Sequence, residues 1–339
     1  MPITDILGPE RIAKGLFWTR PWSLVSGCTK CSPGCKNCWL ESMAHRFPKG
    51  QPPGVVTPEG HWTGKIVTHP ERLDLPLKTR KPQVFAIWSD LLHEGVPWQF
   101  IIEALNIMAQ CERHIFLIIT KRPERMKEIM FRLGESTPGD FAININLETL
   151  GHFGPNIYLL TTAENQHWAD IRFPIALQIP AAVRIALVEP MLGPVDLEEW
   201  IWPGCRLSKE EHDKHCGGGE WCESVSLHGV IAGAETGPHA RPAHPDWFRQ
   251  VRDDCQAAGV PFFFKSWGEW APVAPIYSDH EIDEEALDNS RFSSKRLETI
   301  DLNGKLWPEF QPPPGSWLME RVGKHAGRLL DGKEWNSLP

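Results

Sequence analysis

The sequence has no stretch of apolar residues long enough to cross a membrane. The longest aliphatic run, near Ile115 to Ile119, is far shorter than the roughly 20 residues that a spanning helix needs. The first segment, Met1 to Gly15, carries charged residues and no apolar core of a secretory signal. We therefore expect a cytoplasmic protein with no membrane partner.

The sequence also lacks an excess of positive charge. It has 35 Lys and Arg against 43 Asp and Glu, a net charge of −8. Such a chain has no overall basic field to hold it on duplex nucleic acid, although a local basic groove remains compatible with this charge. Tyrosine is scarce, but there are 16 tryptophans. Among them, Trp39, Trp88 and Trp267 are candidates to stack a base, with core packing as the alternative.

A closed set of disulfides is excluded because the number of cysteines, nine, is odd. Four cysteines lie within residues 28–38 and three within residues 205–222, whereas Cys111 and Cys255 stand alone in predicted helices. In a reducing compartment, clustered thiols bind metal more often than they form disulfides. The two groups are therefore candidate metal sites, and the two isolated cysteines are expected to pack in the core.

Short apolar runs alternate along the chain with longer amphipathic segments. Continuous apolar runs are typical of parallel strands that are covered on both faces, and their alternation with helices predicts βαβ units. The sequence therefore predicts an α/β fold, a partial or full TIM-like (β/α) barrel. The predicted strands are residues 83–88, 114–119, 156–160, 183–188, 227–232 and 260–264, with a first strand near 16–25; the predicted helices are 40–46, 98–111, 122–133 and 246–258.

Two regions interrupt this alternation. Residues 197–226 are predicted to be an insertion between two barrel units, so that the barrel spans residues 1–270. Residues 271–339, rich in Pro and charge, are predicted to form an irregular C-terminal extension that packs on the barrel. The insertion holds a candidate second metal site for zinc or an auxiliary iron–sulfur cluster, with a solvated loop as the alternative. Its possible ligands are Cys205, His212, His215, Cys216 and Cys222.

The strongest local signal is the segment from Gly27 to Trp39, GCTKCSPGCKNCW. Pro33 and Gly34 force a turn, so the four thiols are brought together by a segment too short for the long spacer of a two-knuckle zinc site. A tight group of cysteines is also how iron–sulfur clusters are held. The spacing offers two ligand sets: Cys35 and Cys38 combined with either Cys31 or Cys28.

Polar side chains follow each of the predicted strands. Parallel barrels place their active sites at this end of the strands. Any one such residue is equally well explained as a helix cap or as part of an ion pair at the barrel rim, but the recurrence favours a common site. The candidates are Ser89, Asp90, Lys121, Glu164, Asn165, Glu189, Glu235 and Lys265.

With its C-x3-C-x2-C spacing after a first strand, the loop resembles that of the radical S-adenosylmethionine (SAM) superfamily. As a whole, the chain resembles a phage-associated family of three-cysteine, radical-SAM-like proteins. The superfamily has an aromatic residue just before its last cysteine, where this chain has Asn37 and places Trp39 just after. The shared strings are HPERL (69–73), SDLLHE (89–94), TKRPERM (120–126), AENQ (163–166), EPMLGPVDL (189–197), GAETGPHARP (233–242), PFFFKSWGEW (261–270) and GKHAGRLLDG (323–332).

This resemblance implies that three thiolates bind a [4Fe-4S] cluster and that SAM chelates its fourth iron. An external electron donor reduces the cluster, and reductive cleavage of SAM then yields a 5′-deoxyadenosyl radical that abstracts a hydrogen from the substrate. The family's own loop favours Cys28 over Cys31 as the third ligand.

The resemblance also suggests roles for the residues after the strands. Ser89 and Asp90 are predicted to accept from the SAM amino group, for which Glu235 is a second candidate, and Glu164 and Asn165 to hold ribose hydroxyls. Lys121, Glu189 and Lys265 are predicted to be catalytic. Lys121, together with Arg122, would bind the carboxylate of SAM or a substrate phosphate, Glu189 would orient the substrate or exchange protons, and Lys265 would face the site.

The leading hypothesis is therefore a radical-SAM-like iron–sulfur enzyme whose substrate the sequence does not identify. A nucleotide or nucleic acid is one candidate substrate. The alternative hypothesis is a zinc-stabilised, non-enzymatic module that binds nucleic acid or another partner through a structural cysteine loop. The two hypotheses predict different metals.

Overall fold

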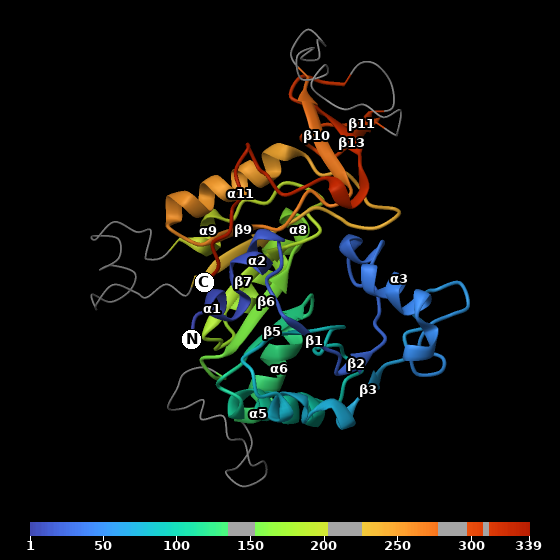
Figure 1. The fold of residues 1–339 in the computed structure, drawn as a ribbon, viewed down its shortest axis with the longest axis vertical. Helices are drawn as coiled ribbons and strands as arrows, with labels where there is room; N and C mark the ends of the chain where they lie inside the picture. The colour runs from blue at the N-terminus through green and yellow to red at the C-terminus, as the bar shows by residue number, and fades with distance from the viewer. Residues whose placement is uncertain (135–152, 203–225, 277–296, 308–311) are drawn as a thin grey trace.

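The computed structural model describes residues 1–134, 153–202, 226–276, 297–307 and 312–339. Its centre is a mixed α/β body in which seven parallel strands curl into a half-barrel (Figure 1). Neighbouring strands follow the order β1-β4-β5-β6-β7-β8-β9. Their bounds are β1 Arg20–Trp22, β4 Val84–Ile87, β5 Ile115–Thr120, β6 Ile157–Thr162, β7 Val183–Val188, β8 Gly229–Ala232 and β9 Phe262–Phe264.

The sheet is a partial barrel. Among the described residues, β1 pairs only with β4 and β9 only with β8 within this sheet, so β1 and β9 are its edges. The six predicted strands after the first are confirmed, each within two residues of its predicted bounds. The predicted first strand is divided into β1 and β2 (Val25–Ser26), and β2 leaves the sheet to pair with β3 (Val67–Thr68).

Helices lie between most of the parallel strands. All four predicted helices are present, as α3, α5, α6 and α11, whereas α8 lies in a segment for which no helix was predicted. The helices are α1 Ile3–Leu7, α2 Pro9–Ala13, α3 Trp39–Arg46, α4 Leu75–Lys78, α5 Trp98–Gln110, α6 Pro123–Gly134, α8 Gln166–Leu177, α9 Glu198–Ile201 and α11 Pro245–Ala258, with 3-10 turns at Pro33–Cys35, Pro48–Gly50, Pro70–Arg72 and Gly323–His325. None of the described helices is both long and apolar enough to cross a membrane.

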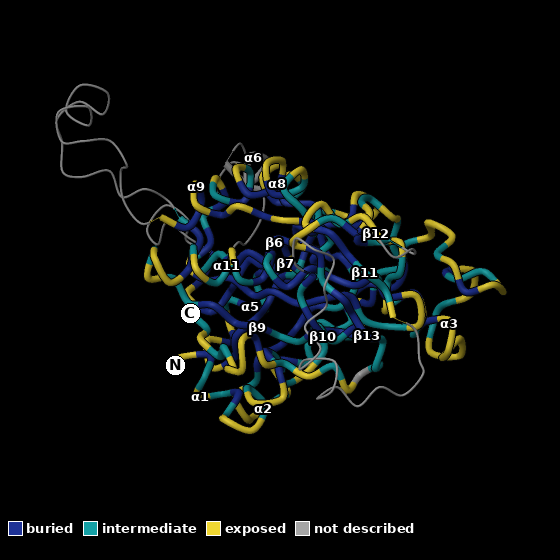
Figure 2. Tube along the Cα trace, turned by 90° about the horizontal axis from the view of Figure 1, so that it is seen from above, coloured by how far each residue is buried: buried dark blue, intermediate teal, exposed yellow. Residues whose placement is uncertain are grey.

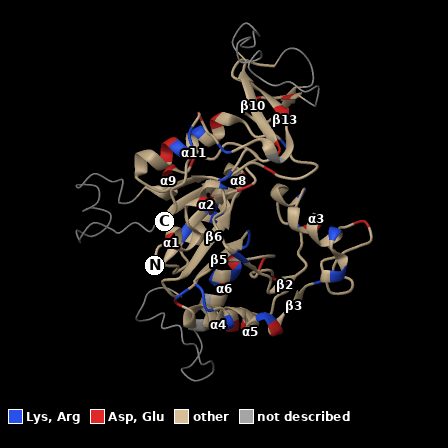
Figure 3. Ribbon diagram, viewed as in Figure 1, with Lys and Arg blue, Asp and Glu red and all other residues tan. Residues whose placement is uncertain are grey.

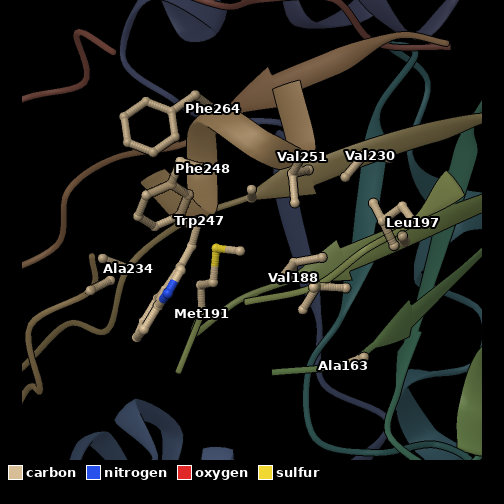
Figure 4. Packing of buried hydrophobic residues seen from close by; sticks show 14 of the residues in the cluster. Ala163, Val188, Met191, Leu197, Val230, Ala234, Trp247, Phe248, Val251 and Phe264 are labelled. Atoms are coloured by element: carbon tan, nitrogen blue, oxygen red, sulfur yellow. The ribbon is translucent and has the colours of Figure 1, made fainter. Parts of the chain in front are cut away.

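The two faces of the sheet bury different apolar clusters. In β5, Phe116 and Ile118 point to the face that packs on α5, whereas Ile115 and Leu117 point to the face that packs on α1. This alternation follows from the period of two of a strand. Towards β9, the helix face is completed by side chains of α11 and its neighbours (Figure 4). Burial on both faces explains why the strands have continuous apolar sequences.

The C-terminal extension is more regular than predicted. Its strands form a separate four-stranded antiparallel sheet in the order β10-β13-β11-β12. The prediction of an irregular segment missed these strands because proline and charge are frequent in the region. The last residues lie against the main sheet, where Asn336 bridges to Phe263 and Phe264 N donates to Trp335 O. The strands are β10 Trp270–Pro275, β11 Leu297–Ile300, β12 Leu306–Trp307 and β13 Trp317–Arg321.

Candidate functional site

The cysteine loop, residues 27–39, leaves the β2–β3 ribbon and ends where α3 begins. Gly27 has a φ of 93°, and a Cβ atom there would lie 2.0 Å from Lys65 O, so only glycine fits this exit. The predicted turn is a single 3-10 turn over Pro33–Cys35. The four cysteines of the loop are free and partly exposed.

The first contact that holds the loop comes from the ends of β4 and β5. Asp90 is buried and accepts from Arg122 Nη1 at 3.0 Å and from Thr120 Oγ1 at 2.8 Å. Arg122 in turn donates through Nη2 to Thr29 O at 3.0 Å and to Thr29 Oγ1 at 2.8 Å, and through Nε to Glu94 at 2.8 Å. The guanidinium therefore joins two strand ends to the start of the loop.

A second contact comes from the end of β6 and from α8. Glu164 has no exposed surface, and its two oxygens accept from Gly34 N at 3.0 Å and from Arg172 Nη1 at 3.1 Å. Arg172 also donates to Thr162 O at 2.8 Å, and its Nη2 lies 3.9 Å from Cys31 Sγ. The pair thus contacts the loop at its turn and at one of its thiols.

A third contact comes from the end of β8. Glu235, which is also buried, accepts from Arg241 Nη2 at 2.6 Å and Nε at 2.8 Å, and from Asn37 Nδ2 at 3.0 Å. Arg241 Nη2 donates to Pro33 O at 3.0 Å, and Asn37 Nδ2 also donates to His239 O at 2.7 Å. Asn37 is therefore a hydrogen-bonding group that ties the loop to β8.

These three carboxylate–arginine pairs, which we call the loop anchors, share one arrangement. Each carboxylate follows a parallel strand, and each arginine reaches the cysteine loop. Buried charges are tolerated only when they are paired and fully hydrogen-bonded. The loop therefore completes the hydrogen bonding of charges that would otherwise be costly at this edge of the sheet. The pairs are Asp90–Arg122, Glu164–Arg172 and Glu235–Arg241.

Three residues that were predicted to contact SAM are the carboxylates of the loop anchors. Asp90, Glu164 and Glu235 all accept from protein donors, and their predicted contacts to SAM stay predictions. Asn165 caps α8, since its side chain accepts from Trp168 N at 3.2 Å. Ser89 has a φ of 62°, a strained backbone conformation for a non-glycine residue. Strain of this kind often marks a functional turn.

The thiols have different proton affinities. A hydrogen bond from the Cys31 thiol lowers the pKa of Cys35 to about 4, and the charge of Lys121 contributes in the same direction. That bond raises the pKa of Cys31, together with burial. Burial, followed by the charge of Asp90, raises the pKa of Cys28 to about 12, and burial also raises the pKa of Cys38. Of the four thiols in the loop, Cys35 is therefore the one whose surroundings most favour the thiolate.

The donor set suits a thiolate-bound cluster, although it is not assembled into a closed site. Among the described residues, no three His, Cys, Asp or Glu side chains are grouped closely enough to hold a metal ion. The loop nonetheless supplies four free thiols, and cationic groups adjoin two of them: Arg172 at Cys31, and Lys121, whose charge acts on Cys35. Positive charge near a cysteine favours the thiolate, the form that binds metal.

Two further candidates form an ion pair of their own at the same edge of the sheet. Lys265, after β9, donates to Glu189, after β7. The side chains are 29% and 17% exposed, more than the carboxylates of the loop anchors. A side chain at Gly233 would approach both residues, so this glycine leaves space for the pair.

A cavity of ≈ 470 Å³ opens beside the loop. It is lined by Cys31 and Thr29 of the loop and by Lys121, Arg122, Trp168 and Arg172, among others. Its volume is within the usual range for small-molecule sites. A second cavity of ≈ 490 Å³ is lined by Gln166, Asp196, Glu198, Glu199 and Trp200 and contains no thiol. The first cavity is the better ligand site because it adjoins the cysteines.

A family model described as "Protein of unknown function (DUF5131)" matches residues 15–339. The chain belongs to this family. The matched range includes the cysteine loop and all three loop anchors. No functionally curated protein matches the chain.

The proposed second metal site lies outside the described residues, which do not include 203–225. Cys205, His212, His215, Cys216 and Cys222 all fall in that range, so their role as ligands stays a prediction. Cys111 and Cys255 are fully buried, as expected for cysteines that pack in the core.

Sequence reasoning missed three residues that hold the loop: Asn37, Arg172 and Arg241. Arg172 was missed because α8 was not predicted. The capping residue Asn165 was the available signal for that helix. Arg241 belongs to the GAETGPHARP string, but nothing in its spacing shows that it turns back onto Glu235.

Proposed function

We propose that this protein is a radical-SAM-like iron–sulfur enzyme whose cluster is held by three of the four cysteines in the loop. One observation carries the proposal: three carboxylate–arginine pairs, whose carboxylates are buried at the ends of β4, β6 and β8, converge on a short loop of free thiols. A loop that serves only as a connection needs no such set of paired charges. The expense of burying them is consistent with a loop whose shape must be kept while the thiols bind a cofactor.

Cys35 and Cys38 are the ligands common to both possible sets, and Cys28 or Cys31 completes the site. When bound, a reduced [4Fe-4S] cluster supplies the electron that cleaves SAM to methionine and a 5′-deoxyadenosyl radical. The chain's own residues hold the loop, through Arg122, Arg172 and Arg241, and keep positive charge beside the thiolates.

Lys121 and the Glu189–Lys265 pair are the groups that we propose to face the substrate. Lys121 lines the cavity beside Cys31, and no hydrogen bond from its ammonium group to a described residue is found. It therefore retains its capacity to bind an anionic group of SAM or substrate. Lys265 donates to Glu189 at the partly exposed side of the strand ends, where a substrate that separates the two groups would meet one proton donor and one acceptor.

The test is anaerobic purification and reconstitution with iron and sulfide, followed by iron, sulfide and zinc analysis. We expect about four irons and four sulfides per chain, the content of one [4Fe-4S] cluster, and formation of 5′-deoxyadenosine when SAM and dithionite are added. A colourless protein with one zinc per chain after the same treatment would overturn the proposal in favour of a structural zinc site.

Single Cys→Ala variants identify the ligands. Cys35→Ala and Cys38→Ala should each lose most of the bound iron, and only one of Cys28→Ala and Cys31→Ala should do the same. Cys111→Ala is the matched control, because Cys111 is buried in the core and should leave the iron content unchanged. Equal iron retention in all four loop variants would contradict the site.

A further inference from the structure

The segment from Cys28 to Thr68, which we call the basic arm, differs in charge from the rest of the chain. It contains five Lys and Arg and two Glu, a net charge of +3 within a chain of −8. All five basic side chains are exposed. Glu41 is buried and paired with Lys30 at 2.8 Å, so Glu59 is the only exposed acidic side chain of the arm.

Most of the positive charge on the arm is unneutralised. No carboxylate of the described residues lies within salt-bridge distance of Lys36, Arg46, Lys49 or Lys65. An exposed surface of this kind attracts anionic ligands, and its effect is local because salt screens charges beyond about 10 Å.

Exposed aromatic side chains accompany the charge. Trp39 begins α3 and is 50% exposed, and Phe47 follows the helix and is 57% exposed. Of the exposed large hydrophobic residues that are described, only one other is aromatic, Trp202. Trp39 is held edge-on against Trp88, with ring centroids 5.2 Å apart, which leaves part of the indole open. Exposed aromatic rings among basic residues are the surface on which unpaired bases stack.

The arm also lies at the edge of the sheet that carries the candidate site. It begins with the cysteine loop and continues into α3, which extends away from the half-barrel (Figure 1). Seen from above, the region around α3 is mostly exposed (Figure 2), and basic residues lie along it (Figure 3). A strand bound to Trp39 would thus lie one residue from Cys38.

We propose that the basic arm binds single-stranded nucleic acid, with backbone phosphates at Lys36, Arg46 and Lys49 and bases stacked on Trp39 and Phe47. Single strands are favoured over duplexes because their bases are free to stack on aromatic rings, and because a charge of +3 supplies few phosphate contacts. The further inference that this strand carries the substrate rests on the proposed function, whereas binding itself does not.

The test is fluorescence anisotropy with a labelled 12-nucleotide single-stranded DNA and with the same sequence as a duplex. We expect saturable binding of the single strand that weakens with salt, and weaker binding of the duplex. Each phosphate contact contributes about 0.7 to the slope of log affinity against log salt. The double variant Lys36→Ala/Lys49→Ala should therefore lower the slope by about 1.4. Lys14→Ala/Lys81→Ala, which removes two exposed lysines outside the arm, should leave it unchanged.

Stacking is tested with Phe47→Ala, because the exposed Phe47 side chain is not part of the core. We expect roughly tenfold weaker binding, which corresponds to about 1.4 kcal/mol and lies within the usual contribution of one stacked base. Trp39→Ala should weaken binding to a similar degree, and Trp202→Ala is the matched control with an exposed aromatic residue elsewhere.

Three outcomes would overturn the proposal: absence of single-strand binding at low salt, equal loss of affinity in the arm variants and their controls, or preference for the duplex. The anisotropy is measured on the metal-free and the reconstituted protein. Binding of the single strand without iron incorporation would therefore reject only the proposed function. Iron incorporation without binding of the single strand would reject only the proposal that the basic arm binds nucleic acid.

Discussion

Carboxylates follow four strands at the same edge of the sheet, yet the structure uses them in two ways. Asp90, Glu164 and Glu235 are buried, and each accepts from an arginine that also reaches the cysteine loop. Glu189 is partly exposed, and its only ion-pair partner among the described residues is Lys265. Their positions after the strands are equivalent, so position does not distinguish a residue that holds the loop from one that is open to a ligand. The two kinds of residue are distinguished by burial and by the number of protein donors that each carboxylate accepts from.

The difference has an energetic consequence. A carboxylate without exposed surface cannot lose its partner without leaving a charge unsolvated, whereas water replaces the partner of an exposed one. The loop anchors are therefore expected to determine stability and loop shape, and the Glu189–Lys265 pair to affect activity with little effect on stability.

The largest expected effect is that of Glu164→Gln, which keeps the shape of the side chain but leaves the Arg172 charge buried and unpaired. We expect the free energy of unfolding to fall by about 3–5 kcal/mol. Glu189→Gln, the matched change in the exposed pair, should cost no more than about 1 kcal/mol. Urea unfolding of the metal-free proteins measures both values. If the two variants lose the same stability, the distinction between the two kinds of carboxylate is wrong.

A smaller effect is expected at the point where the second anchor meets the loop. A Cβ atom on Gly34 would lie 3.1 Å from the Glu164 carboxyl carbon, and that carboxylate is fixed by Arg172. Gly34→Ala should therefore cost about 1–3 kcal/mol, the usual range for overpacking, and should lower the iron content after reconstitution.

Gly50→Ala is the control for this change. Gly50 lies in the same arm, and a Cβ atom there would meet no atom within 4 Å. Equal stability of the two variants in urea would show that the loop moves freely relative to Glu164. In that case the Glu164–Arg172 pair does not hold the loop.

The strands and the edge that carries the site could be predicted from the sequence because burial on both faces produces continuous apolar runs. The residues after those strands could be identified as candidates for the same reason. The side chains that pair with these residues could not be predicted from the sequence. Arg172 lies in α8, which has Pro174 in its interior, so its sequence did not indicate a helix. Asn37 and Glu235 are 198 residues apart, and no local pattern relates two side chains at that separation.

The smallest expected effect concerns pH and the first anchor. His93 Nδ1 accepts from Gly95 N at 3.0 Å, so its Nε2 carries the proton and donates to Thr29 Oγ1 at 2.8 Å. Burial, followed by the charge of Arg122, lowers the pKa of His93, while Glu94 and Asp90 act in the opposite direction. The folded state therefore favours the neutral imidazole of His93. The stability that this preference contributes is fully present above the unfolded pKa of about 6.5, and it is lost as the pH falls from 6.5 through the lower pKa of the folded state.

Between pH 7.5 and 5.5 we therefore expect the wild-type protein to lose more stability than His93→Asn, by on the order of 1 kcal/mol, the value of one hydrogen bond. Asparagine preserves an acceptor for Gly95 N but does not titrate. Urea unfolding at the two pH values measures the difference, with His45→Asn as the control because His45 is exposed. If wild type and His93→Asn respond alike to pH, His93 does not couple protonation to the first anchor. The pH dependence would then come from the other histidines whose pKa burial lowers, His114, His228 and His244.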